Sequence, residues 1–128
     1  MADLAVVFFK VEQTSAQTKL KTVRLAYGYT LTPSAEECSA GTTFDVAVDI
    51  LGDDLVRDDV LVGGVDQHRL VFPPDSPRLP LAERRELIVG QALLDEDLGT
   101  DEIKLRIVAT PEGGEPVSVN TPVVRGDF

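Results

Sequence analysis

The sequence has few of the residues that build covalent frameworks and metal sites. Among its 128 residues are one cysteine, Cys38, one histidine, His68, and no tryptophan. A lone cysteine cannot form an internal disulfide, and one thiol with one imidazole is too small a ligand set for structural zinc. A single free thiol is typical of a reducing compartment, so we expect a cytoplasmic protein.

Long apolar runs are also missing. The run near the start, residues 4–9, is far shorter than the roughly 20 residues that a membrane-spanning helix needs. No basic residue precedes it and no small-residue cleavage pattern follows it, so a signal peptide is not expected. The sequence therefore predicts no membrane partner.

Positive charge is scarce. Twelve Lys and Arg stand against twenty-two Asp and Glu, which gives a formal net charge of −10. A surface of this sign repels the phosphates of nucleic acids and the headgroups of anionic lipids. We therefore expect no nucleic-acid partner.

Catalytic motifs are absent from the sequence. It contains no Gly-x-Ser-x-Gly elbow, and the pairs Gly63-Gly64 and Gly113-Gly114 lack the Lys-Ser/Thr that completes a phosphate-binding loop. Both pairs are expected to be hairpin turns. His68 lies between two polar neighbours at the start of an expected strand, and we expect it at the surface. The sequence predicts no catalytic residue and no organic cofactor, and hence a protein that is not an enzyme.

Hydrophobic residues recur mainly with a period of two. Hydrophobic residues alternate with polar or small ones most regularly over residues 23–31, 44–50 and 102–109, and this alternation is typical of half-buried strands. Residues 4–11 are apolar on both faces except for Lys10, which favours a strand central to its sheet or covered on both sides. Weaker strands are expected at 59–62, 68–72 and 117–124, and Pro122 should place the last at an edge or bulge.

Residues 73–94 contain a proline-rich segment, followed by a segment that fits either a helix or a strand. Residues 73–80 hold four prolines and must form a loop or a crossover between sheets. Residues 81–94 fit a helix that starts after Pro80, or a strand that is apolar on both faces. Gly90 would weaken a helix by about 1 kcal/mol relative to Ala, so a strand is favoured.

These elements predict an all-β protein. Seven or eight short strands separated by Gly, Pro and Asp turns favour one antiparallel β-sandwich domain spanning residues 1–128, of immunoglobulin-like or C2-like architecture. If residues 81–94 were helical, the fold would be α+β.

Acidic clusters are the chemically notable constellation. One lies in the loop 53–59 and the other in the loop 95–102. Calcium takes six to eight oxygen ligands in irregular geometry, so two acidic loops at one end of a sandwich could hold it. Solvated turns explain the same residues, because Asp favours turns. The candidate ligands are Asp53, Asp54, Asp95, Asp97 and Asp101.

Two resemblances concern these loops. Asp95 and Asp97, followed by Asp101 and a strand, are similar to the third calcium loop of C2 domains, although the gap to Asp101 is short. The stretch from Phe44 to residues 56–59 resembles the calcium-binding TerD domain of tellurite-resistance proteins. Each resemblance implies a calcium-binding sandwich.

The expected function is that of a non-enzymatic binding or assembly module, with a protein partner or a second copy of the chain. Two strands that are apolar on both faces, 4–9 and 87–94, suggest that another chain covers some apolar surface. The alternative is a calcium-binding sandwich of the C2-like or TerD-like kind.

Overall fold

A computed structural model describes residues 2–13, 22–53, 58–90 and 101–126 of the chain. These residues form eight strands and one short helix, which confirms the predicted all-β sandwich. In chain order the elements are β1 (Asp3–Gln13), β2 (Thr22–Thr32), α1 (Ala35–Ala40), β3 (Thr42–Asp53), β4 (Asp58–Phe72), β5 (Leu81–Gly90), β6 (Asp101–Pro111), β7 (Val117–Asn120) and β8 (Val124–Gly126).

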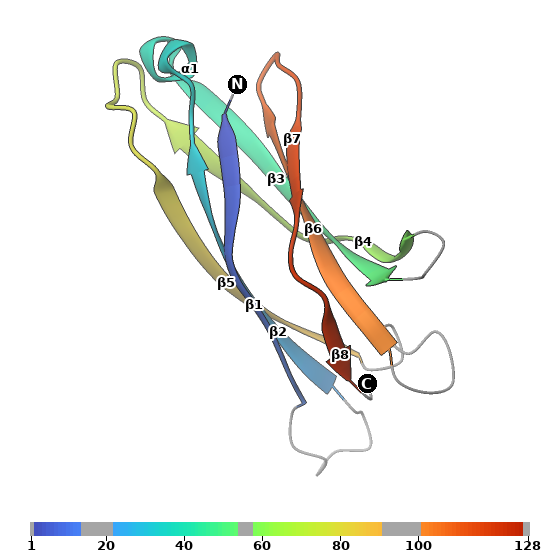
Figure 1. Cartoon of the computed structure of the whole chain (residues 1–128). Helices are drawn as coiled ribbons and strands as arrows, with labels where there is room; N and C mark the ends of the chain where they lie inside the picture. The colour runs from blue at the N-terminus through green and yellow to red at the C-terminus, as the bar shows by residue number, and fades with distance from the viewer. Residues whose placement is uncertain (1, 14–21, 54–57, 91–100, 127–128) are drawn as a thin grey trace.

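The strands form two antiparallel sheets that face each other (Figure 1). One sheet has the order β1-β2-β5. The other has the order β4-β3-β6-β7, with β8 also paired to β6. Immunoglobulin domains place their first, second and fifth strands apart from a sheet built on their third, sixth and seventh. The chain follows that arrangement, with β4 added beside β3.

The core lies between the sheets. The alternating positions predicted for residues 23–31, 44–50 and 102–109 all point into it, because successive side chains of a strand point to opposite faces. Those that are 0 % exposed are Val23, Leu25, Tyr27, Tyr29, Leu31, Phe44, Val48, Ile50, Ile103, Leu105, Ile107 and Ala109.

The strand interpretation of residues 81–94 is confirmed over Leu81–Gly90, and residues 91–94 lie outside the described residues. Residues 73–80 form the loop that leads from β4 in one sheet to β5 in the other. Of the two predicted alternatives, a loop or a crossover between sheets, the segment is a loop that makes the crossover. Within this loop, the Arg78 side chain donates to the carbonyl of Pro33 over 2.8 Å.

The expectation that residues 4–11 form a central strand is wrong. β1 lies at the edge of its sheet. A bulge at Val7 explains the apolar pattern on both faces: Val6 lies opposite Tyr29 and Phe8 lies opposite Gly28, so Val7 has no partner across the ladder. The bulge shifts the alternation by one residue and leaves Val7 64 % exposed.

The expected hairpin turn at Gly63-Gly64 is also wrong. These residues lie inside β4, which runs continuously through the two strands that the sequence predicted separately. The register with β3 shifts here, since Val48 pairs with Asp66 and Ile50 pairs with Val62. Gly64 has a φ of 60° and donates its N–H to Asp49 Oδ1 over 2.8 Å. A bulge with a left-handed glycine therefore takes the place of a turn. The other pair, Gly113-Gly114, lies in the turn between β6 and β7, as expected.

Two short features remain: a helix that precedes β3, and the segment that contains β7 and β8. Helix α1, which the sequence analysis did not predict, begins with a capping box in which Ser34 and Glu37 bond each other's backbone N–H groups. At the far edge, the single strand predicted over residues 117–124 is divided at Pro122 into β7 and β8, and β7 lies at the edge of the sheet, as expected. Between them, Thr121 is buried and pairs with Leu105 of β6 through its backbone N–H and its hydroxyl.

Candidate functional site

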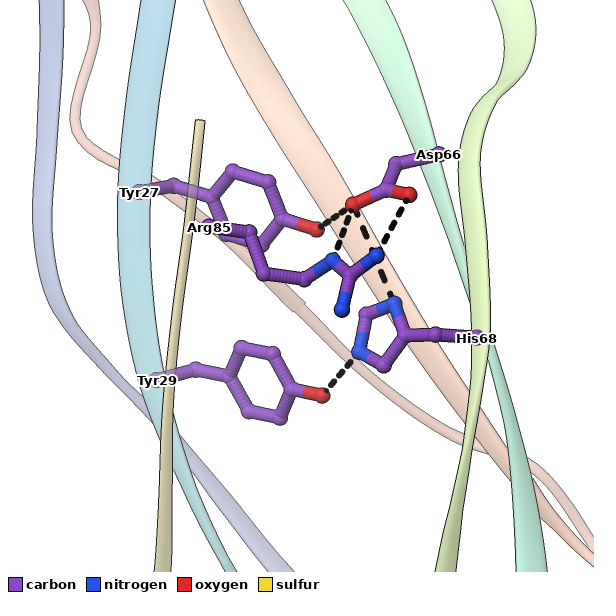
Figure 2. A network of polar contacts seen from close by, with 5 residues as sticks. All are labelled: Tyr27, Tyr29, Asp66, His68 and Arg85. Atoms are coloured by element: carbon purple, nitrogen blue, oxygen red, sulfur yellow. Dashed lines mark hydrogen bonds and ion pairs between the residues drawn. The ribbon is translucent and has the colours of Figure 1, made fainter. Parts of the chain in front are cut away.

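A network of polar side chains lies between the two sheets (Figure 2). Tyr27 and Tyr29 share the inward face of β2 because they are two residues apart, and Asp66 and His68 do the same on β4. The Tyr27 hydroxyl donates to Asp66 Oδ2 over 2.5 Å, and the Tyr29 hydroxyl lies 2.5 Å from His68 Nε2. Two polar contacts thus join the sheets side by side.

Arg85 brings β5 into the network. Its Nε donates to Asp66 Oδ2 over 2.7 Å, and its Nη2 donates to Oδ1 over 3.4 Å. The Asp66 side chain is 11 % exposed and that of Arg85 is 35 % exposed. Because β4 and β5 are edge strands of different sheets, this ion pair joins the two edges on the side where the 73–80 loop crosses.

The surroundings fix the protonation of three of these groups. Burial alone would raise the pKa of Asp66, but hydrogen bonds from Arg85 and Tyr27 stabilise the carboxylate more, so its pKa lies below the ordinary value. Burial raises the pKa of Tyr27, and the hydrogen bond to Asp66 adds to that rise. Burial and then the charge of Glu83 raise the pKa of Tyr29. Both phenols are therefore neutral beside an ionised carboxylate.

His68 is held in its neutral form. Burial, and then the charge of Arg85, lower its pKa below 6.5. We assign Tyr29 as the donor to Nε2, which puts the imidazole proton on Nδ1. That nitrogen lies 3.8 Å from Asp66 Oδ2 and has no hydrogen-bond partner among the described residues. A proton added to His68 would go to Nε2, where the Tyr29 hydroxyl would have to change from donor to acceptor.

A carboxylate, an imidazole and a hydroxyl in sequence have the composition of a nucleophile triad. Tyr29, however, is 0 % exposed, and its raised pKa keeps the hydroxyl protonated. A nucleophile must reach its substrate, and this hydroxyl is sealed between the sheets. In this conformation the network connects the two sheets, and it contains one group that can take up a proton, the imidazole of His68.

The outer face of the three-stranded sheet carries a second notable set of residues. Val7 is 64 % exposed and Ile88 is 61 % exposed. The Phe8 ring lies over Gly28, where an added Cβ would come within 2.5 Å of the ring. Beside the ring is an open hollow of about 270 Å³ to which all three strands contribute, with Val7, Phe8, Gly28, Ala82 and Arg84 in its lining. We call this surface the outer face.

The charges of the outer face balance. Arg84 lies over the Phe8 ring with its guanidinium carbon 4.9 Å from the ring centre, and the Lys10 ammonium lies 5.8 Å from it. By strand alternation the described charged residues on this face are three basic and three acidic: Lys10, Arg24 and Arg84 against Asp3, Glu12 and Glu86. The outer face is therefore neutral, on a chain with a net charge of −10.

No known family model and no curated protein matches this chain.

The structure describes the predicted metal ligands only in part. Asp53 ends β3 and Asp101 begins β6, and the pairing of Gly52 with Ile103 brings both to the same end of the sheet. Asp54, Asp95 and Asp97 lie outside the described residues. Within the described ranges, no group of three or more His, Cys, Asp or Glu is placed to hold a metal ion. In the same ranges, no helix is long and apolar enough to cross a membrane.

The sequence analysis missed the polar network. It placed His68 at the surface, which is wrong: the side chain is 8 % exposed and points inward. Polar neighbours on either side suggested exposure, but in a strand they face away from His68. Counting back in twos from Phe72 through Leu70 would have put His68 and Asp66 on the core face.

Proposed function

We propose that this protein is a non-enzymatic interaction module that binds another protein chain through its three-stranded sheet. The observation that carries the proposal is the outer face, which is neutral and partly apolar on an otherwise strongly acidic chain. Scattered exposed apolar residues are common on soluble proteins. Here, however, Val7, Phe8 and Ile88 share one face with an open hollow, and such patches mark interaction sites.

The chemistry of this face favours a protein over other partners. A net charge of −10 disfavours nucleic acids and anionic membranes. The Phe8 ring between two cationic side chains offers an apolar contact rimmed by donors, as protein interfaces do. We place the module in the cytoplasm, because its single thiol, Cys38, is buried and free.

A photo-crosslinking residue in place of Ile88 tests the proposal in the native host. The matched control carries the same residue in place of Val71, which is 66 % exposed on β4 of the other sheet. We expect a discrete protein adduct from position 88 and none from position 71, with adduct masses read by mass spectrometry. No adduct from position 88, or the same adducts from both positions, would contradict the proposal.

As a second candidate we propose a calcium-binding sandwich. It is favoured by the register of β3 and β6, which brings Asp53 and Asp101, one from each acidic loop, to one end of the sheet. Asp54, Asp95 and Asp97 would supply further carboxylates from the same two loops.

Thermal melting with 1 mM calcium or with EDTA tests this candidate. A ligand that binds only the folded state raises the melting temperature. We expect a rise with calcium in the native chain and none in an Asp53→Asn/Asp101→Asn variant. Equal melting temperatures in calcium and EDTA would exclude the candidate.

A further inference from the structure

The edges of the two sheets differ in how they are protected. An unpaired edge strand invites pairing with another chain, and bulges, prolines and lysines prevent this. Among the described residues, β1 carries the bulge at Val7, β4 carries the bulge at Gly64, and Pro122 separates β7 from β8. These edges are poor templates for a new strand.

β5 has none of these three devices. Its ten residues, Leu81–Gly90, pair with β2 without a register shift and include no proline or lysine. A charge that points inward can also protect an edge, and Arg85 points inward. Its charge is already neutralised by Asp66, at 2.7 Å. The second edge of β5 has no strand beside it among the described residues.

We infer that the partner is a second copy of this chain, which pairs antiparallel with the free edge of β5 about a twofold axis at Arg85. This inference rests on the proposed function and names the partner. The two three-stranded sheets then join into one continuous sheet, and their outer faces become a single surface.

The sequence of β5 selects this register. Antiparallel pairing about Arg85 extends from Leu81 to Val89 on both copies. In this register Arg84 of each copy lies opposite Glu86 of the other, so the twofold axis gives two such pairs. It also places Ile88, which is 61 % exposed, opposite Ala82, and Leu81 opposite Val89. Opposite charges and apolar pairs in these positions stabilise a sheet.

The nearest alternative register is less favourable. An axis at Arg84 would place that arginine opposite itself on the outer face. It would also bring Pro80 into the ladder, where it has no N–H to donate. With the axis at Arg85, the residue that meets its own copy is the arginine whose charge Asp66 already balances.

The charge of the outer face is compatible with self-association. Two copies with a charge of −10 each repel one another over most of their surface. Arg24 and Glu12 pair across β1 and β2, and Arg84 and Glu86 alternate along β5, so the outer face adds no net charge to that repulsion. The charges of the outer face therefore do not oppose self-association at this sheet.

Charge reversal tests the inference by sedimentation equilibrium. We expect the native chain to form dimers, and Arg84→Glu and Glu86→Arg each to weaken dimerisation by at least about tenfold, because each variant faces like charges at both cross-strand pairs. An equimolar mixture of the two variants should form heterodimers, in which both pairs are again opposite in charge. The doubly substituted chain, Arg84→Glu/Glu86→Arg, should dimerise like the native chain.

Arg69→Glu is the matched control, since Arg69 is an exposed arginine of β4 that pairs with Asp45. Its dimerisation should equal that of the native chain. Circular dichroism of each single variant checks that it is folded, and the doubly substituted chain shows whether position 84 tolerates the change beside Phe8.

The outcomes separate this inference from the proposed function. Monomeric native chain at millimolar concentration, or a mixture that fails to form heterodimers while the single variants are folded, overturns the inference. If the probe at position 88 then captures a different protein, the proposed function stands and the partner is foreign. If the probe at position 88 captures nothing, both the inference and the proposed function are contradicted.

Discussion

At the scale of the residue, Asp66 is the group on which the cross-sheet network depends. We expect Asp66→Asn to lower the free energy of unfolding by about 2–3 kcal/mol, because it weakens two hydrogen bonds and leaves Arg85 without its counter-charge. Urea unfolding measures the loss. In the control, Asp45→Asn removes a pair whose side chains are 68 % and 74 % exposed, and it should cost less than about 0.5 kcal/mol. Equal losses in the two variants would contradict a special role for Asp66.

His68 makes stability depend on pH. Its folded-state pKa lies below 6.5, whereas the unfolded chain binds the proton with the ordinary value. The unfolded state therefore takes up more protons as the pH falls below about 6.5, and stability that is complete above that pH declines. Glu83 of β5, Asp66 of β4, and Arg85 and Tyr29 on the facing strands are the groups that surround the imidazole.

Because His68 is the only histidine, one variant isolates this effect. His68→Gln keeps a polar partner for the Tyr29 hydroxyl but does not titrate. We expect the native chain to lose stability in urea unfolding between pH 7 and pH 5.5, and the variant to stay nearly level. The same decline in both would assign the pH dependence to other groups.

At the scale of the element, Thr121 holds the chain between β7 and β8 against β6. Its hydroxyl accepts the N–H of Leu105 over 2.8 Å in a buried position. Thr121→Val preserves the shape and removes the acceptor, so we expect a loss of about 1–3 kcal/mol in the free energy of unfolding. Amide hydrogen exchange should quicken at Leu105. Thr121→Ser retains the hydroxyl and should keep that amide protected; if it exchanged as fast as in the valine variant, the hydrogen bond would not be the cause.

At the scale of the whole molecule, pairing through β5 couples stability to concentration. A partner that binds only the folded chain raises the melting temperature by mass action. We expect the melting temperature of the native chain to rise across a hundredfold increase in protein concentration, and that of Arg84→Glu to rise less over the same range. Calorimetry at matched concentrations checks this. A native melting temperature independent of concentration would contradict a stable dimer.

The elements that could be predicted from the sequence are the strands that bury one face in the core and expose the other. In residues 23–31, 44–50 and 102–109 a period of two reports directly which side chains face the core, since a strand has only two faces. The helix α1 was also readable, because Ser34 and Glu37 have the spacing of a capping box, but its six residues carry too little periodicity to stand out.

The polar network and the edges could not be read in the same way. Tyr27 and Asp66 are 39 residues apart, and their contact exists only because two sheets stack face to face. The apolar run at residues 4–9 looked central, but it lies at the edge of its sheet, and the bulge at Val7 leaves that apolar residue exposed. A bulge depends on the pairing of two strands, and the shifted alternation that it leaves in the sequence looks like a strand that is apolar on both faces.

By itself, the sequence determined the all-β class, the loop at residues 73–80, the strands with one-sided burial and the strong negative charge, because all of these follow from local spacing and composition. Only the tertiary structure decided that Asp66 and His68 meet the tyrosines of β2, that β5 lies at the edge of its sheet among the described residues, and that the outer face is neutral. These properties arise when residues distant in the chain meet across a ladder or between two sheets. The spacing of residues along one strand does not show which other strands pair with it or pack against it.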